Sequence, residues 1–82
     1  DSHKYNIVVE GNKAKFSQNS LLRNYLLSTG NAVLVEASPY DRIWGIGMYE
    51  SQARQGSVDS WKGENLLGYA LMEVRDWLNN QN

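Results

Sequence analysis

Two carboxylates near the middle of the chain, Glu36 and Asp41, have the residue type and spacing best suited to chemistry. They are five residues apart across a turn at Pro39, so both could face one ligand. Hydrolysis of a glycosidic bond requires two carboxyl groups about 5 to 9.5 Å apart. The pair could stabilise an oxocarbenium-like ribosyl cation and activate water. The structural alternatives are that Glu36 bonds loop amides, and that Asp41 forms an Asx turn or pairs with an arginine.

Two indoles could hold a planar ligand beside these carboxylates. Trp44 and Trp61 lie close to glycines, which let a flat group approach, so a base or ribose could stack on either ring. The alternative for at least one of them is core filling. Asn65 could cap the helix that follows it or, with the positive end of that helix, contact a phosphate. Lys15 and Arg75 are candidate phosphate contacts, and the alternative for both is a solvated helix surface.

Other familiar chemistries lack their residues. Gly45 and Gly47 begin a pattern whose third glycine would fall at Glu50, so the dinucleotide-binding fingerprint is absent. Ser38 has no hydrolase motif around it, and His3 is the only imidazole in the chain. The chain has no cysteine, which excludes disulfides, thiol nucleophiles and zinc-thiolate sites. We expect no metal site.

Helical and extended patterns flank the candidate residues. Apolar residues at helical spacing predict a first helix over 13–29, ended by Gly30, and a second over 64–79. Residues 32–36 predict a short strand that leads into a long functional loop, and residues 5–9 give a weaker strand signal. We expect 49–63 to form a polar, lid-like loop. The predicted fold is α+β and α-rich.

Composition sets broad limits. With 82 residues, 41% of them hydrophobic, the chain is expected to fold as one small domain. A formal net charge of −1 with scattered basic residues gives no support for generic nucleic-acid binding. No apolar run is long enough to span a bilayer and no signal segment is present, so we expect a cytoplasmic protein without a membrane partner.

Four segments of the sequence, taken together and in order, carry a family resemblance. They are Lys15-Phe16-x-Gln18-Asn19, Leu26-Leu27-x-Thr29-Gly30, Leu34-Val35-Glu36-Ala37-Ser38-Pro39-x-Asp41-x-x-Trp44-Gly45-x-Gly47 and Trp61-x-Gly63-x-Asn65-x-Leu67-Gly68-x-Ala70-Leu71-Met72-x-Val74-Arg75. Each is unspecific alone. In this order and spacing, over residues 13–78, they closely resemble the C-terminal half of the NADAR (YbiA-like) superfamily.

The resemblance implies an N-glycosidase that acts on a ribosylated base. The implied substrates are phosphoribosylamino-pyrimidine intermediates of riboflavin synthesis, or an ADP-ribosyl compound such as ADP-ribosylated guanine. It implies catalytic roles for Glu36 and Asp41, without dividing nucleophile, base and acid between them. The implied substrate-binding residues are Lys15, Trp44, Gly45, Asn65, Gly68 and Arg75. No cofactor is expected, because hydrolysis at an anomeric carbon needs no redox chemistry.

The chain departs from the family in length. Members are about twice as long, and their N-terminal half carries a Glu-His-type motif with a further glutamate that has no counterpart here. Residues 1–82 are therefore expected to be either a single domain or the C-terminal portion of a larger NADAR-like domain. Two alternatives to an enzyme stay open. One is a non-catalytic module that binds ADP-ribose or a nucleotide, and the other is an inactive fragment that needs a partner such as the missing N-terminal half.

Overall fold

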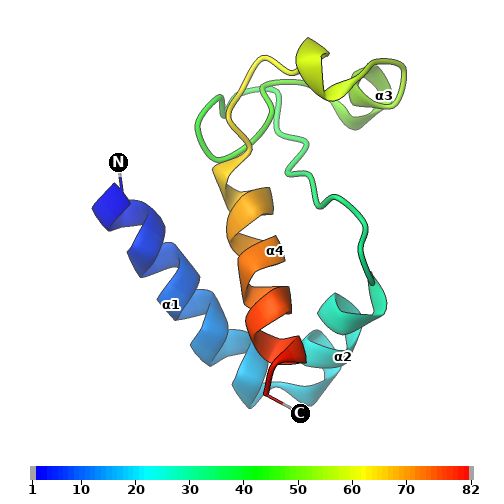
Figure 1. Ribbon diagram of the computed structural model, residues 1–82. Coiled ribbons are helices and arrows are strands. Elements are labelled where there is room, and N and C mark those ends of the chain that lie inside the picture. The colour runs from blue at the N-terminus through cyan, green and yellow to red at the C-terminus, as the bar shows by residue number, and fades with distance from the viewer. Residues whose placement is uncertain (1, 82) are drawn as a thin grey trace. The chain divides into compact units, whose positions relative to one another are not determined.

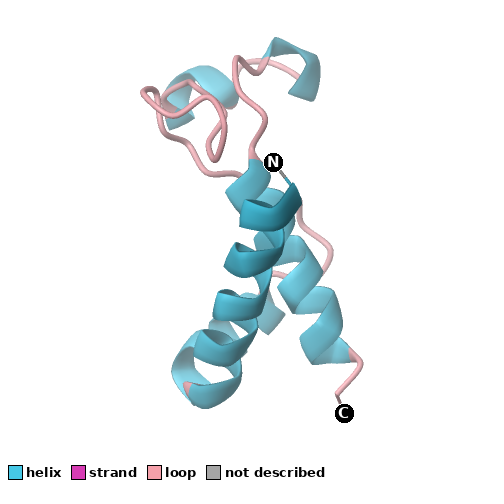
Figure 2. Ribbon diagram, turned by 90° about the vertical axis from the view of Figure 1, so that its left-hand side faces the viewer, coloured by secondary structure: helices cyan, strands magenta, loops and turns pink. Residues whose placement is uncertain are grey.

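All regular elements in the part of the chain that the computed structural model describes, residues 2–81, are helices (Figure 2). In chain order they are α1 (Ser2–Gln18), α2 (Ser20–Ser28), α3 (Glu50–Ala53), the 3-10 helix η1 (Val58–Ser60) and α4 (Leu66–Asn79) (Figure 1). The chain divides into unit 1, residues 1–33 with 70–82, and unit 2, residues 34–69. The boundary between the units falls inside α4, after Tyr69.

Unit 1 is built from α1, α2 and the C-terminal part of α4, each of which contributes buried apolar side chains. In α1 and α2 the buried apolar side chains are Val9, Phe16 and Leu26. In α4 they are Ala70, Val74 and Leu78, which lie four residues apart along one helix face. The helix predicted over 64–79 is therefore confirmed as α4.

The helix predicted over 13–29 is two helices in the structure, and the first begins earlier than expected. Asn19 interrupts the run: its backbone is extended, and its Oδ1 accepts a hydrogen bond from the Leu22 amide at 3.1 Å, which caps α2. The weak strand signal at 5–9 is also wrong, because these residues are part of α1. The predicted ending is confirmed, since Gly30 follows the last residues of α2 with a left-handed φ of 61°.

The predicted strand at 32–36 is wrong, and the α+β fold class is wrong with it. No strand occurs among residues 2–81, so the described fold is helical. A strand needs a neighbouring backbone to complete its ladder, and three backbone groups of this segment bond to side chains instead. The Leu34 carbonyl and the Glu36 amide bond the side chain of Asn65, and the Ala32 carbonyl bonds that of Arg75.

Unit 2 consists largely of loop. The polar stretch predicted over 49–63 contains the short helices α3 and η1, neither of which has a buried residue. The buried apolar side chains of this unit are Ile46 and Met48, which follow the carboxylate-bearing loop. The first turn of α4 completes the unit, so the candidate residues between 36 and 68 all belong to it.

Candidate functional site

Asp41 organises the loop in which it lies. Its Oδ1 accepts hydrogen bonds from the backbone amides of Ile43 at 3.0 Å and Trp44 at 2.8 Å. These bonds, above all the one from Trp44, lower the pKa of the Asp41 carboxyl below its ordinary value. Asp41 is therefore a carboxylate at neutral pH, able to stabilise positive charge but unsuited to donating a proton. The Asx turn considered from the sequence is the observed local geometry.

Glu36 is held by its backbone while its side chain is exposed. The Glu36 amide donates to Asn65 Oδ1 at 2.9 Å, and its carbonyl accepts from the amides of Ser38 and Ile46, both at 3.0 Å. Within residues 2–81 the carboxylate itself makes no hydrogen bond or ion pair. The bond from Ile46 closes the loop that contains Asp41. One hydrogen-bonded loop thus contains both candidate catalytic carboxylates.

The backbone just before and at the start of α4 is bonded to this loop. Glu64 and Asn65 donate their amides to the carbonyls of Arg42 and Gly45, at 2.8 and 2.9 Å. The first two amides of α4, those of Leu66 and Leu67, donate to the carbonyls of Ile43 and Trp44 at 3.1 and 3.0 Å. Amides that could have received a phosphate at this helix end are thereby used within the chain.

The side chain of Asn65 is wholly buried and forms a bridge. Its Nδ2 donates to the Leu34 carbonyl at 3.0 Å while its Oδ1 accepts from the Glu36 amide. This is the pattern that one residue of a parallel neighbouring strand would make with its N–H and C=O, and here a side-chain amide makes it. Asn65 also has a positive φ of 55°, a conformation that asparagine tolerates better than most residues. A direct contact of Asn65 with a ligand stays a prediction.

Two glycines of the predicted site are required by close packing. A Cβ on Gly68 would collide with the Leu34 carbonyl oxygen and with both amide atoms of Asn65. A Cβ on Gly45 would lie 2.9 Å from the carbonyl oxygens of Glu36 and Asp41. Both positions therefore serve the approach of one backbone segment to another. Their contribution to substrate binding stays a prediction.

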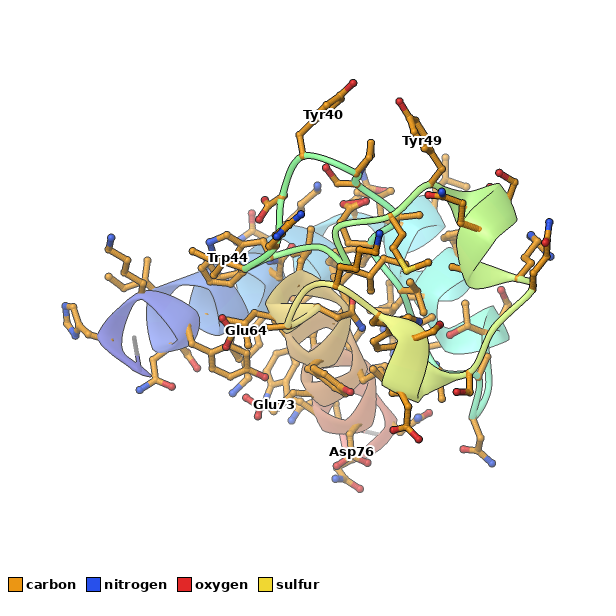
Figure 3. All side chains as sticks on the ribbon, turned by 90° about the horizontal axis from the view of Figure 1, so that it is seen from above. Tyr40, Trp44, Tyr49, Glu64, Glu73 and Asp76 are labelled. Carbon is orange, nitrogen blue, oxygen red and sulfur yellow. The ribbon has the colours of Figure 1, made fainter. Side chains whose placement is uncertain are left out.

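The aromatic residues of unit 2 include a pair that the sequence reasoning missed. Trp44 and Trp61 are each half-buried. Tyr40 and Tyr49, by contrast, are exposed and point the same way from the loop, with their hydroxyls 3.4 Å apart (Figure 3). The hydrogen bond to Tyr40 is the main reason that the pKa of Tyr49 is raised. The only available signal was the position of Tyr40 within the Asp41 loop and of Tyr49 shortly after it.

Lys15 and Arg75, the remaining predicted site residues, belong to unit 1. Lys15 is exposed on α1, with its Nζ 5.7 Å from the centre of the Phe16 ring. Arg75 is buried, and its Nη1 donates to Thr29 Oγ1 and to the Ala32 carbonyl. The structure therefore gathers six of the eight predicted residues in unit 2 and gives Arg75 a set of partners inside unit 1. Contact of Lys15 and Arg75 with a phosphate stays a prediction.

Residues 2–81 contain neither a metal-binding group nor a membrane-spanning helix. No group of three or more His, Cys, Asp or Glu side chains is arranged to hold a metal ion. None of the helices combines the length and apolar character needed to cross a membrane. The expectation that the site uses no metal or cofactor stays a prediction.

Comparison with known proteins decides the family. The model of the NADAR domain matches residues 1–79, almost the whole chain. The chain belongs to the NADAR family. The resemblance seen in the four sequence segments is therefore confirmed, and the loop of Glu36 and Asp41 is a part of a NADAR domain.

Several curated NADAR relatives are similar to this chain. It is 54% identical over 76 residues to an N-glycosidase of Acanthamoeba polyphaga mimivirus, a match that covers 93% of this chain and 45% of the relative. Against the N-glycosidase YbiA of Escherichia coli, identity is 38% over 78 residues, covering 95% and 42%. Against the chloroplastic riboflavin biosynthesis protein PYRR of Zea mays it is 43% over 75 residues, covering 92% and 10%. The chain spans less than half the length of each of these relatives.

Proposed function

We propose that this chain supplies one part of an N-glycosidase that hydrolyses the bond between a ribosyl group and a base. The single observation that supports this most directly is that one hydrogen-bonded loop contains both Glu36 and an ionised Asp41. Relatives named as N-glycosidases, and the family of the chain, support the same reaction type. The substrate class is a phosphoribosylamino-pyrimidine or an ADP-ribosyl compound, and the cytoplasmic location belongs to the same proposal.

Within this proposal the two carboxylates have different tasks. Asp41 keeps its charge and is fixed by backbone amides, which suits electrostatic stabilisation of a ribosyl cation as the bond to the base breaks. Glu36 has an exposed carboxylate without a partner among residues 2–81, which suits activation of the water that attacks the anomeric carbon. Trp44 offers the ring on which base or ribose stacks.

The remaining candidates extend the proposed site. Lys15 and Arg75 would contact phosphate, and Gly45 and Gly68 would shape the site by letting the loop backbone pack closely. Because the relatives are more than twice as long as their match to this chain, the complete site is proposed to need a second part. That part would be the N-terminal half of a NADAR domain, in the same polypeptide or as a partner.

A chimera tests the proposed reaction. The 78 residues of the Escherichia coli relative that match this chain are replaced by this chain, and release of free base is measured from a phosphoribosylamino-pyrimidine and from ADP-ribosylated guanine. We expect turnover that falls about 10²- to 10⁴-fold in the Glu36→Gln variant. Asp41→Asn should lower kcat as well. Turnover unchanged by either substitution would remove that residue from the reaction.

A non-catalytic binding module is the second candidate, because the exposed Tyr40 and Tyr49 could hold a planar ligand without any chemistry. Calorimetry with ADP-ribose on the 82-residue chain distinguishes it. Saturable binding without release of a base, in this chain and in the chimera, would favour the module over the enzyme.

A further inference from the structure

Asn65 combines three properties, each of which alone would cost folding free energy. Its side chain is completely buried, its backbone has a left-handed φ of 55°, and its amide bonds backbone atoms 29 and 31 residues away. A buried polar side chain and a strained φ are normally retained only where the surroundings determine them. The combination indicates that Asn65 has a specific task within unit 2.

The two bonds of Asn65 fix the backbone on both sides of Val35. The Leu34 carbonyl accepts from Nδ2 and the Glu36 amide donates to Oδ1, so the peptide groups before and after Val35 are both held by Asn65. The Glu36 carbonyl is held separately by the amides of Ser38 and Ile46. The exposed Glu36 side chain makes no bond of its own among residues 2–81. The backbone therefore sets the point and direction from which this side chain extends, and the Glu36 amide depends on Asn65.

We infer that Asn65 is a positioning residue: its buried amide places the Glu36 carboxylate for the reaction and does not touch the substrate. The inference rests on the proposed N-glycosidase function. A ligand cannot reach a side chain that is 0% exposed unless unit 2 opens. Gly68 is part of the same arrangement, because only hydrogen at its Cα leaves room for the Leu34 carbonyl and the Asn65 amide.

The role in positioning predicts a kinetic signature that differs from that of a substrate contact. Displacement of a catalytic group by about 1 Å can cost 10²-fold in rate. Loss of the Asn65 amide should therefore lower kcat by about 10- to 100-fold and leave KM within about threefold, because ground-state binding is untouched. A residue that contacts the substrate in the ground state would raise KM instead.

The test uses Asn65→Gly in the active chimera, since glycine accepts the positive φ while the side chain that carries the amide is removed. The same substitution is made in a Glu36→Gln background, giving a double-mutant cycle. If Asn65 acts through Glu36, Asn65→Gly should change kcat by less than about threefold once Glu36 has lost its charge. Equal losses in both backgrounds, or a rise in KM, would overturn the inference.

Hydrogen exchange gives a second measurement that does not need turnover. The Glu36 amide should exchange at least tenfold faster in Asn65→Gly than in the unaltered 82-residue chain, while amides inside α1 keep their rates. Unchanged exchange at Glu36 would overturn the inference whatever the activity.

If Asn65→Gly does not fold, Asn65→Asp replaces it: this variant keeps the acceptor for the Glu36 amide and should retain more kcat than Asn65→Leu. If the unaltered chimera has no turnover, the proposed function and the catalytic part of this inference fail together. Hydrogen exchange then still tests whether Asn65 holds the Glu36 amide.

Discussion

Arg75 Nη1 donates a hydrogen bond to Thr29 Oγ1 at 2.8 Å, joining two residues of unit 1 that are 46 positions apart. The Thr29 hydroxyl in turn donates to the Leu26 carbonyl at 2.6 Å, and Arg75 also reaches the Ala32 carbonyl at 2.9 Å. The partners of this buried guanidinium are neutral oxygens. Its bonds tie α4 to the end of α2, so a structural contribution of Arg75 can be measured separately from any contact with phosphate.

Replacement of Arg75 by methionine should lower the free energy of unfolding by about 1 to 3 kcal/mol, because a hydroxyl and a carbonyl lose their buried donor. Urea denaturation followed by circular dichroism measures the change. Arg54→Met is the matched control: Arg54 forms a solvent-exposed ion pair with Glu50, and loss of this pair should cost less than about 1 kcal/mol. A methionine variant at position 75 as stable as the unaltered chain would contradict the structural role.

A methyl group on Gly68 should be strongly destabilising, since it would meet the Leu34 carbonyl and the Asn65 amide. We expect Gly68→Ala to lower the free energy of unfolding by about 1 to 3 kcal/mol. Gly11→Ala is the control, because Gly11 lies inside α1 with nothing within 4 Å of the added carbon. That change should stabilise the chain by about 0.5 to 1 kcal/mol. Thermal unfolding of both variants should give shifts of opposite sign.

Removal of the side chain that caps α2 should weaken the junction between the first two helices. Asn19→Ala eliminates the bond from the Leu22 amide and is expected to cost about 1 kcal/mol. Asn24→Ala, at an exposed position inside α2, should be neutral or slightly stabilising because alanine favours helix. Equal effects of the two substitutions in urea denaturation would rule out a specific capping role for Asn19.

The lowered pKa of Asp41 predicts how stability responds to acid. The folded state holds the Asp41 carboxylate with backbone amides, so its pKa is lower in the folded than in the unfolded chain. The stabilisation is then complete above the ordinary pKa of aspartate, about 4, and is lost as pH falls through the lower folded value. Asp41→Asn should remove this part of the acid dependence when unfolding is measured from pH 7 downward. Asp59→Asn, which removes a charge outside the Asp41 loop, should leave this acid dependence of stability unchanged.

The spacing of apolar residues was sufficient to predict a helix where one face of that helix is buried. The apolar residues of 64–79 predicted α4, and Ala70, Val74 and Leu78 are buried along it. The same approach joined the end of α1 to α2, because a single asparagine between two helical segments does not interrupt the periodic signal. It also missed the helical state of residues 5–9, where β-branched residues favour a strand and α1 nevertheless continues through them.

The roles of the candidate site residues stay predictions, while their connections were not predictable from the sequence. Asn65 and Gly68, expected as ligand contacts, bond or pack against Leu34 and Glu36, about 30 residues away in the chain. Contacts between residues so far apart in the chain do not change the local spacing of residue types in the sequence. The strand at 32–36 failed for the same reason, because its pattern cannot reveal that a side-chain amide replaces the neighbouring strand.

The bond between Asn65 and Leu34 closes a loop of 31 residues. Closing a flexible loop of that length costs about 3 kcal/mol of chain entropy. The first amides of α4 find their partners only in that closed loop. The first turn of α4 is therefore expected to become ordered in the same step as the loop that contains the two carboxylates.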